Sequence, residues 1–280
     1  MLKRKLQNQA KTKENKTLKN DSADESRTSS LFAKPFWQKF YEIELELNEK
    51  LSKMTKKPPA IQYIYNPVEY AKEVHCEYLR KYLNGCKKVL FVGMNPGANG
   101  MGQTGVPFGN ITTVRDIMQL SGLVEQPHET HPKRPVNGLQ HTTEEPSGKR
   151  LWPLLEKLAD GSLDTFFKQC FVHNFCPLMY FDKHGKNITP SELKGDYKQE
   201  ILHVCLETLE SLIQLVNCEI VVAVGDYVFQ CLKKSENCQT KRIMKLPHPS
   251  PRAVGNQNWP EKADKWFHKE QLLPYIRGEL

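Results

Sequence analysis

The sequence lacks the long apolar runs that membrane proteins carry. No apolar stretch of the 280-residue chain approaches the roughly 18–20 residues that cross a bilayer. Residues 1–16 read MLKRKLQNQAKTKENK and contain no apolar core, so we expect no secretory leader. These absences argue against the membrane and secreted classes of protein, and we expect no membrane partner.

The sequence is also poor in metal-site and nucleotide-phosphate motifs. Its eight cysteines include no C-x-x-C pair, and in a chain without a leader we expect them to be free thiols. His128 and His131 have the spacing of metal ligands. They lie in a proline-rich stretch without a cysteine or acidic cluster, so we interpret them as a chance pair. No Gly-Lys-Ser/Thr element occurs, which excludes a P-loop. We therefore expect neither a metal nor a cofactor.

One glycine-rich stretch raises a nucleotide-binding alternative. Gly100, Gly102 and Gly105 match the G-x-G-x-x-G fingerprint of dinucleotide-binding folds. That fingerprint has to follow a strand directly and open a helix. Here it begins several residues after the predicted strand, and Pro107 stands where the helix would run. The pattern therefore disfavours a nicotinamide-dependent enzyme.

Basic residues are concentrated at the N-terminus. The chain has 40 Lys and Arg against 32 Asp and Glu, a net charge of +8 that favours a polyanionic partner. Residues 1–30 contain eight basic and four acidic residues and no aromatic one. We predict a disordered basic tail over residues 1–32. Lys3, Arg4 and Lys5 form a cluster typical of nuclear import or phosphate contact, so we expect a nuclear protein; a merely solvated tail is the alternative.

Apolar periodicity predicts alternating helices and strands after residue 33. Short, non-alternating apolar runs, typical of strands buried on both faces, lie at 89–93, 170–176 and 219–225, with a weaker one at 241–246. Helical patterns begin at Pro35 and at Asn66-Pro67, and then cover approximately 112–121, 148–159, 190–216, 226–235 and 258–275. The order predicts a three-layer α/β fold with a short, mainly parallel four-stranded sheet.

Domain organisation follows from the same pattern. We expect one domain over residues 33–280, with a helical N-terminal extension, because no linker interrupts the chain after residue 60. The long loop 123–149, rich in Pro and His, either packs over this domain or remains mobile.

Unusual polar residues follow three of the predicted strands. The three segments are Gly93-Met94-Asn95-Pro96-Gly97, His173-Asn174 and His248-Pro249-Ser250-Pro251-Arg252. Because ligands of parallel sheets bind at the carboxyl ends of the strands, we expect these segments to meet at one rim. Taken singly, each has a structural interpretation: Asn95 as a turn cap, Phe108 as a core residue, and His248 as a hydrogen-bonded structural histidine.

Taken together, these side chains suit a flat heterocycle. Asn95 offers an amide able to hold a water molecule, and His248 a donor for a developing anion. Phe108 offers a face for stacking, and Asn174 offers one donor and one acceptor to read an edge. The residues alone thus favour recognition of a ring from which an anion departs.

These motifs resemble one enzyme family closely. They are similar to the motifs of the single-strand-selective monofunctional branch of the uracil-DNA glycosylase superfamily. The segments that carry the similarity are Gly93-Met-Asn-Pro-Gly97, Gln103-Thr-Gly-Val-Pro-Phe-Gly109, His173-Asn174 and His248-Pro-Ser-Pro-Arg252. The similarity extends over residues 60–275. It departs from the family at Ala98-Asn99, where Pro-Phe is common, and in a shorter segment after Arg252 that lacks a proline.

The resemblance implies a uracil-DNA glycosylase-like fold and a base-excision repair enzyme. Such an enzyme flips uracil, or an oxidised C5-substituted uracil such as 5-hydroxymethyluracil, from single- or double-stranded DNA. It hydrolyses the N-glycosidic bond and leaves an abasic site. By similarity, Asn95 positions the water and His248 stabilises the departing anion. The residues that bind the base would be Met94, Gly97, Met101, Phe108 and Asn174. None of the motifs contains a lysine, so we expect no Schiff base and no linked strand cleavage.

DNA is the expected partner of a monomeric protein, and two segments are candidates to hold its backbone. The first is a basic loop that leads to a predicted helix N-terminus at Thr189, and we expect the loop and the helix N-terminus together to bind a phosphate. The loop consists of Lys183, His184, Gly185, Lys186 and Asn187. Ser250 is a second phosphate candidate, and Arg252 would lead a wedge into the duplex. An ordinary solvated loop is the alternative for the first segment.

Two other functions remain open. A mismatch-directed thymine/uracil glycosylase would share Asn95 but differ at His248. A catalytically silent reader of damaged or single-stranded DNA would keep the stacking Phe108 without turnover. The presence of both Asn95 and His248 counts against the silent reader.

Overall fold

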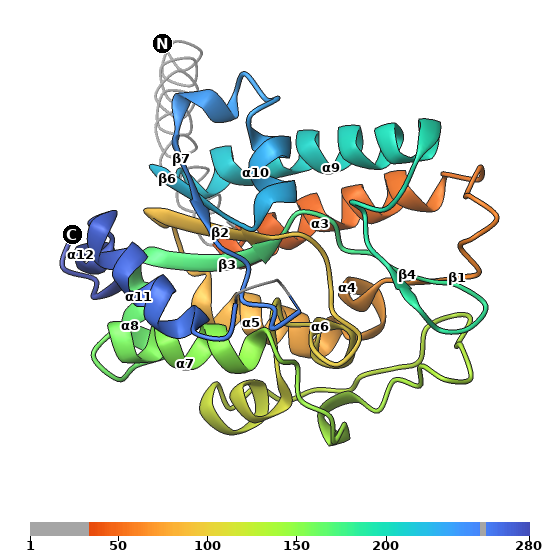
Figure 1. Cartoon of the computed structure of the whole chain (residues 1–280), viewed down its shortest axis with the longest axis horizontal. Coiled ribbons are helices and arrows are strands. Elements are labelled where there is room, and N and C mark those ends of the chain that lie inside the picture. Colours follow the sequence, from red (N-terminus) through yellow and green to blue (C-terminus); the bar gives the residue numbers. More distant parts are fainter. Residues whose placement is uncertain (1–33, 253–255) are drawn as a thin grey trace, which may run out of the picture. The chain divides into compact units, whose positions relative to one another are not determined.

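The core of the protein is a parallel sheet made of four strands, in the order β3-β2-β6-β7 (Figure 1). The strands are β2 (Val89–Gly93), β3 (Cys170–Asn174), β6 (Ile220–Val224) and β7 (Arg242–Leu246), and every neighbouring pair is parallel. All residues of β2, β3 and β6 are buried, which explains their unbroken apolar sequences. The predicted sheet is confirmed, and the weaker fourth strand is its exposed edge.

The computed structural model describes residues 34–252 and 256–280. The predicted basic tail, 1–32, therefore lies outside the described residues, as does part of the shortened segment after Arg252. Phe36–Leu280 form one compact unit.

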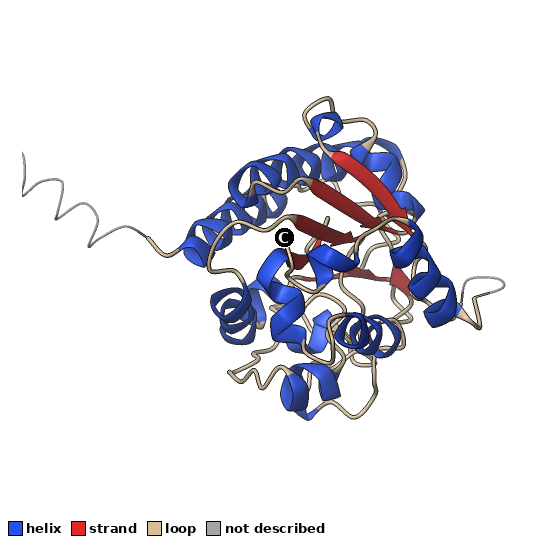
Figure 2. Ribbon diagram, turned by 90° about the vertical axis from the view of Figure 1, so that its left-hand side faces the viewer, coloured by secondary structure: helices blue, strands red, loops and turns tan. Residues whose placement is uncertain are grey.

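Helices cover both faces of the sheet (Figures 1 and 2). They are α3 (Phe36–Ser52), α4 (Pro67–Tyr70), α5 (Lys72–Tyr82), α6 (Met101–Thr104), α7 (Gly148–Leu158), α8 (Leu163–Gln169), α9 (Gly195–Val216), α10 (Asp226–Leu232), α11 (Trp259–Lys269) and α12 (Leu273–Ile276). In Figure 1, α9 and α10 lie on one side of the sheet and α7, α8 and α11 on the other. Phe91 of β2 packs against Phe166 of α8 and Phe267 of α11, which joins one helical layer to the sheet.

A second, smaller sheet stands beside the first. Its strands are β1 (Tyr63–Tyr65), β4 (Met179–Phe181) and β5 (Asn187–Ile188), paired antiparallel in the order β1-β4-β5. The sequence did not predict this sheet, because runs of two or three residues are too short to show a period of two. The hairpin between β4 and β5 carries residues 183–186 at its tip.

The predicted start of the long helix is wrong. Thr189 and Glu192 have the spacing of a capping box, and one of its two bonds forms, since the Glu192 carboxylate accepts from the Thr189 N–H at 2.8 Å. The Thr189 hydroxyl donates to the same carboxylate at 2.9 Å. These bonds close a turn and not a helix. Lys194 is extended and Gly195 has a φ of +65°, so α9 begins at Gly195. A capping box satisfies backbone donors in either setting, so the motif alone does not fix where the helix starts.

Other element boundaries also shift. The stretch predicted as a helix over 112–121 is a π-helical turn, η1 (Thr113–Ile117). The C-terminal helix divides into α11 and α12 around Gln271, whose φ is +58°. Asn66 caps α4 as predicted, by accepting from the Val68 N–H at 3.2 Å. The loop 123–149 packs on the domain and includes one short 3-10 turn, η2 (Gly138–Gln140). The other 3-10 turn among the described residues, η3 (Cys238–Thr240), lies between α10 and β7.

Within the described residues, no helix is long and apolar enough to cross a membrane. In the same part of the chain, no group of three or more His, Cys, Asp or Glu side chains is placed to hold a metal ion. All eight cysteines are free thiols. His131 packs its ring on Tyr63, and its Nδ1 accepts from the Lys133 N–H at 3.0 Å, so it has a structural role.

Candidate active site

A cavity of about 410 Å³ opens at the carboxyl ends of the parallel strands. It is lined by Met94, Asn95, Pro96, Gly97, Met101, Phe108, Glu145, Ser147, Asn174, Asn187, Thr189, Ser191, His248 and Ser250. All seven residues predicted to act on or bind the base lie here, together with three of those predicted to contact DNA. We call this space the base cavity.

Asn95 presents an oxygen, not a donor, to the base cavity. Its Nδ2 donates to the carbonyl oxygen of Leu178 at 3.1 Å and more weakly to that of Pro96 at 3.4 Å. Both amide hydrogens are therefore directed at backbone oxygens, and Oδ1 is left as an acceptor. A fixed acceptor of this kind can orient a water molecule through one of its protons.

A sulfur atom and a glycine together fix the orientation of the Asn174 side-chain amide. Its side chain is buried, and Nδ2 donates to Sδ of Met101 at 3.2 Å. Sulfur accepts and cannot donate, so this contact favours the orientation that keeps the NH₂ group toward Met101. Oδ1 lies over the Cα of Gly93, where any Cβ would collide with it. Because Gly93 pairs with Asn174 across the β2–β3 ladder, the two strands themselves set this geometry.

Phe108 is held in an unusual backbone conformation. Its φ is +54°, in the left-handed region that non-glycine residues rarely adopt. The carbonyl of Phe108 accepts from the indole N–H of Trp152 at 3.0 Å and from the N–H of Asn110 at 2.9 Å. The ring consequently faces the cavity, with its centroid 6.0 Å from that of His248. Strain held by surrounding bonds is typical of positions that serve a ligand.

His248 is a neutral imidazole with one defined tautomer. Burial lowers its pKa to about 4. The N–H of Ser250 donates to Nδ1 at 3.0 Å, so the ring proton sits on Nε2. His248 thus offers an Nε2–H donor at neutral pH without a positive charge.

The segment carrying His248 has to cross the end of β6 to reach Phe108. Gly225 favours this path through its backbone, because its φ of +98° lies in a region that residues with a side chain rarely adopt, whereas a Cβ there would meet the His248 ring in ordinary contact at 3.4 Å. The amide of the buried Asn256 then donates to the carbonyls of His248 at 2.9 Å and Ser250 at 2.6 Å. Arg150 donates to the carbonyl of Asn256 at 2.9 Å. Sequence reasoning missed Asn256 and Arg150, since their polar groups serve only the backbone.

Comparison with known proteins identifies the family. Residues 81–272 match the family model described as the uracil DNA glycosylase superfamily. The chain is also similar to curated proteins named single-strand-selective monofunctional uracil-DNA glycosylase. It is 42% identical to the mouse protein over 243 residues, 86% of each chain. It is 41% identical to the rat protein over 243 residues, 86% of this chain and 87% of the rat one.

The chain belongs to the uracil-DNA glycosylase superfamily, in its single-strand-selective monofunctional branch. The bovine relative agrees, with 41% identity over 240 residues, 85% of this chain and 88% of the bovine one. A solved structure of Pedobacter heparinus SMUG2 shares the fold, with a TM-score of 0.58 at 21% identity, covering 83% of this chain and 98% of that one. The enzyme class is that of a glycosylase that hydrolyses the N-glycosidic bond.

The residues predicted to contact DNA divide into three positions in this glycosylase. Asn187, Thr189 and Ser250 line the base cavity. The tip of the β4–β5 hairpin consists of Lys183, His184, Gly185 and Lys186. The Asp182 carboxylate closes this turn by accepting from the N–H groups of His184 and Lys186, both at 2.8 Å. Arg252 is exposed, and its N–H donates to the Ser250 hydroxyl at 3.3 Å.

The structure changes the argument for DNA contact at some of these residues. Because α9 begins at Gly195, Thr189 is not at a helix N-terminus and the helix-dipole argument for a phosphate there is wrong. Gly185 is buried, and its carbonyl accepts from Arg134 Nε at 2.7 Å. Lys183, His184 and Lys186 remain exposed cations or donors at the hairpin tip.

Glu145 is a cavity residue that sequence reasoning missed. Its carboxyl group packs on the Cα atoms of Gly97 and Gly100. Burial raises the pKa of this carboxyl, an effect opposed by bonds from Ser147 and by the charge of Arg252. It comes from the 123–149 loop, whose sequence has no periodicity that predicts which of its side chains point inward.

Proposed function

We propose that this glycosylase removes uracil, and oxidised C5-substituted uracils such as 5-hydroxymethyluracil, from single- and double-stranded DNA. The product is an abasic site in an uncut strand. The observation that carries this proposal is the meeting of an acceptor on Asn95 and an Nε2–H donor on His248 in one cavity, beside the Phe108 ring.

Leaving-group stabilisation supplies the largest share of the proposed rate enhancement. Cleavage of an N-glycosidic bond is dissociative, so the base departs with developing negative charge on its oxygens. The Nε2–H of His248 is preorganised toward that charge, and removing such a donor typically costs about 3–4 kcal/mol. A neutral donor suits this task, since it needs no proton transfer to the uracil anion.

A weak nucleophile then completes the reaction. Asn95 Oδ1 holds the attacking water by one proton, while the oxocarbenium-like sugar supplies the electrophile. An amide is a poor base, so we expect a slower reaction than a carboxylate would give. None of the described residues that line the base cavity is a lysine, which supports hydrolysis without a Schiff base and thus without strand cleavage.

Selection of uracil over cytosine rests on Asn174. With NH₂ fixed by Met101, its second amide hydrogen is available for uracil O4 and its oxygen for N3–H. Cytosine presents the opposite pattern at these two positions. Each mismatched buried polar group costs about 1–3 kcal/mol. The backbone amides of Gly97 and Met101 would face a C5 substituent, with Met94 beside the base.

An excision assay tests this function. A labelled single-stranded oligonucleotide with one uracil is incubated with the protein and divided into samples with and without hot alkali. We expect strand cleavage only in the alkali-treated sample, because the DNA strand at an abasic site stays intact until hot alkali breaks it. Cleavage without alkali would reveal a lyase. Binding without cleavage under either condition would favour the silent DNA reader.

Substrate range needs matched duplexes. The same assay with 5-hydroxymethyluracil, with uracil in a duplex, and with a G·T mispair separates the proposed range from that of a mismatch-directed thymine/uracil enzyme. We propose that the first two are excised and that thymine is not. Thymine excision at a rate comparable to that of uracil would favour the mismatch enzyme.

We also propose nuclear localisation and a monomeric state. Lys3, Arg4 and Lys5 support the first, because clustered cations of this kind direct nuclear import. Fluorescent fusions with and without residues 1–32 would test it, and sedimentation of the purified protein would test the second.

A further inference from the structure

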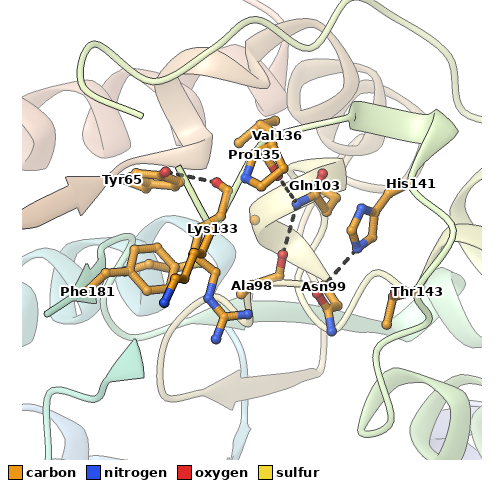
Figure 3. A pocket seen from close by; sticks show the side chains of 13 residues that line it. Tyr65, Ala98, Asn99, Gln103, Lys133, Pro135, Val136, His141, Thr143 and Phe181 are labelled. Carbon is orange, nitrogen blue, oxygen red and sulfur yellow. Dashed lines mark hydrogen bonds between the residues drawn. The ribbon is translucent and has the colours of Figure 1, made fainter. Parts of the chain in front are cut away.

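A second cavity, of about 270 Å³, lies behind one wall of the base cavity (Figure 3). Its lining consists of Tyr65, Ala98, Asn99, Gly102, Gln103, Lys133, Arg134, Pro135, Val136, His141, Thr143, Met179 and Phe181. The shared wall is the segment 97–102. Gly97 and Met101 face the base cavity, whereas Ala98, Asn99 and Gly102 face the second one.

The polar side chain of Gln103 is committed to holding the walls of this cavity. The Gln103 amide donates to the carbonyls of Ala98 at 3.1 Å and Pro135 at 3.2 Å, and its oxygen accepts from the Asn137 N–H at 2.8 Å. These bonds tie the segment 97–102 to residues 135–137. They leave Gln103 without capacity for a ligand.

The side chains of His141 and Asn99 leave a hydrogen-bond donor available on Asn99. His141 Nε2 lies 3.3 Å from Asn99 Oδ1, and its Nδ1 lies 3.5 Å from Asn137 Nδ2. An amide oxygen only accepts, so Nε2 carries the proton. Burial also lowers the pKa of His141, which favours the neutral ring. The Asn99 oxygen is thereby occupied, and its NH₂ group remains. Figure 3 shows that nitrogen turned away from His141.

The cavity also carries two positive charges and no lining carboxylate. Lys133 and Arg134 belong to its wall, as does Thr143. Three acidic residues lie within two positions of the lining along the chain, and each is bound or directed elsewhere. Asp182 accepts from the N–H groups of His184 and Lys186. Glu144 accepts from Asn110 and Thr112, both at 2.6 Å, and Glu145 faces the base cavity. Two cations with amide and hydroxyl donors, unopposed by an acid, match a phosphate group.

This cavity adjoins the hairpin between β4 and β5. Arg134 Nε donates to the carbonyl of Gly185 at 2.7 Å, and His131 Nε2 lies 3.2 Å from the carbonyl of Lys183. These contacts place the 131–134 turn against the hairpin tip, whose Lys183 and Lys186 are exposed. Cations from two distant parts of the sequence therefore share one surface.

We propose that the second cavity binds a backbone phosphodiester of the DNA strand that carries the flipped base. The proposal deepens the function above and rests on it. A base on one side of the 97–102 wall and a phosphate on the other would fix the strand in register, as phosphate contacts do in DNA-binding proteins. Lys133, Arg134 and the Asn99 amide would hold the phosphate oxygens.

One variant and a matched control test the site. Lys133→Ala removes an exposed cation. Lys269→Ala, on α11 away from both cavities, removes an equally exposed cation. Binding of a uracil-containing single strand is measured between 50 and 200 mM salt. We expect Lys133→Ala to lower the slope of log K against log salt by about 0.7, the value for one phosphate contact on a single strand. Lys269→Ala should leave it unchanged.

Neutral linkages identify the phosphate. A series of uracil oligonucleotides, each with one methylphosphonate, is compared in binding to the wild type and to Lys133→Ala. We expect one linkage whose neutralisation weakens wild-type binding about five-fold and has no further effect on the variant. Equal losses in both proteins at every linkage would overturn the proposal. A different ligand would be indicated if each methylphosphonate weakened binding equally in both proteins while inorganic phosphate competed with DNA for the wild type and not for Lys133→Ala. In that case the cavity binds a small phosphate compound instead of the DNA backbone.

These measurements are independent of catalysis. A protein that binds the oligonucleotides but does not excise uracil contradicts the proposed function alone. The linkage series still decides the phosphate site in that case, because its readout is binding.

Discussion

The backbone N–H of Ser250 donates to Nδ1 of His248 across 3.0 Å, and this bond determines the chemistry of the imidazole. It fixes the proton on Nε2, the nitrogen free to face the base. Burial at the same time lowers the pKa of His248 to about 4. The residue is therefore a neutral donor throughout the neutral pH range.

The pH dependence of His248 follows from this arrangement. Because the folded pKa lies below the ordinary histidine value, the unfolded chain takes up this proton first as the pH falls. The stabilisation is complete above about pH 6.5 and is lost progressively down to about pH 4. Nitrogen-15 NMR of the ring should show the Nε2–H tautomer and a midpoint near 4. A midpoint at the ordinary value, or an Nδ1–H tautomer, would contradict the assignment.

Gly93→Ala should disable the base cavity while leaving the sheet intact. A Cβ at this position would lie 2.7 Å from the Phe108 ring and collide with Asn174 Oδ1. Both side chains would have to move, so we expect a loss of excision of about 10²-fold, as for a displacement near 1 Å in a catalytic site. Gly85→Ala is the control, because its Cβ would meet nothing within 4 Å. Equal kcat/KM values for the two variants would argue against a close fit at Asn174.

Met101→Leu should weaken discrimination against cytosine. The change keeps the volume but removes the sulfur that accepts from Asn174 Nδ2 at 3.2 Å. The amide then flips more readily, and a neutral hydrogen bond of this kind is worth about 1 kcal/mol. We expect the ratio of kcat/KM for uracil and cytosine oligonucleotides to fall about five-fold. An unchanged ratio would show that another contact orients Asn174.

Glu145→Gln should stabilise the protein at neutral pH. Burial raises the pKa of this carboxyl in the folded state, so folding favours its protonated form and stability falls as the pH rises through that region. An amide of the same shape avoids the buried charge. Thermal unfolding at pH 7 and pH 4.5 should show a gain for the variant at pH 7 and a smaller difference at pH 4.5. A loss of stability at pH 7 would mean that the ionised carboxylate makes a bond the amide cannot replace.

The sequence predicted the parts of this protein whose signals are local and periodic. Buried strands such as β2 and β6 are unbroken apolar runs, and their order with the helices predicts the sheet. The motifs after the strands predicted the residues of the base cavity because parallel strands end at one rim. The resemblance added roles that residue chemistry alone left open.

The rest depends on contacts between distant segments. Asn256 and Arg150 support the His248 segment through backbone carbonyls, which no spacing reveals. Glu145 reaches the cavity from an irregular loop. The long helix begins later than predicted because an extended Lys194 follows the turn at Thr189. The second cavity joins residues from four separate segments, so only the fold shows that the adjacent Lys133 and Arg134 share a cavity with Asn99.

Single-turnover excision by His248→Ala and Asn95→Ala shows whether this pair of side chains promotes release of the base. Both proteins are assayed beside the wild type on a single-stranded uracil oligonucleotide, with alkali treatment and with binding measured in parallel. We predict that binding persists while excision by His248→Ala falls by about 10²–10³-fold, and that Asn95→Ala is also impaired. Excision at the wild-type rate by both variants would show that the base leaves without help from this pair, and that the cavity described here is not the catalytic one.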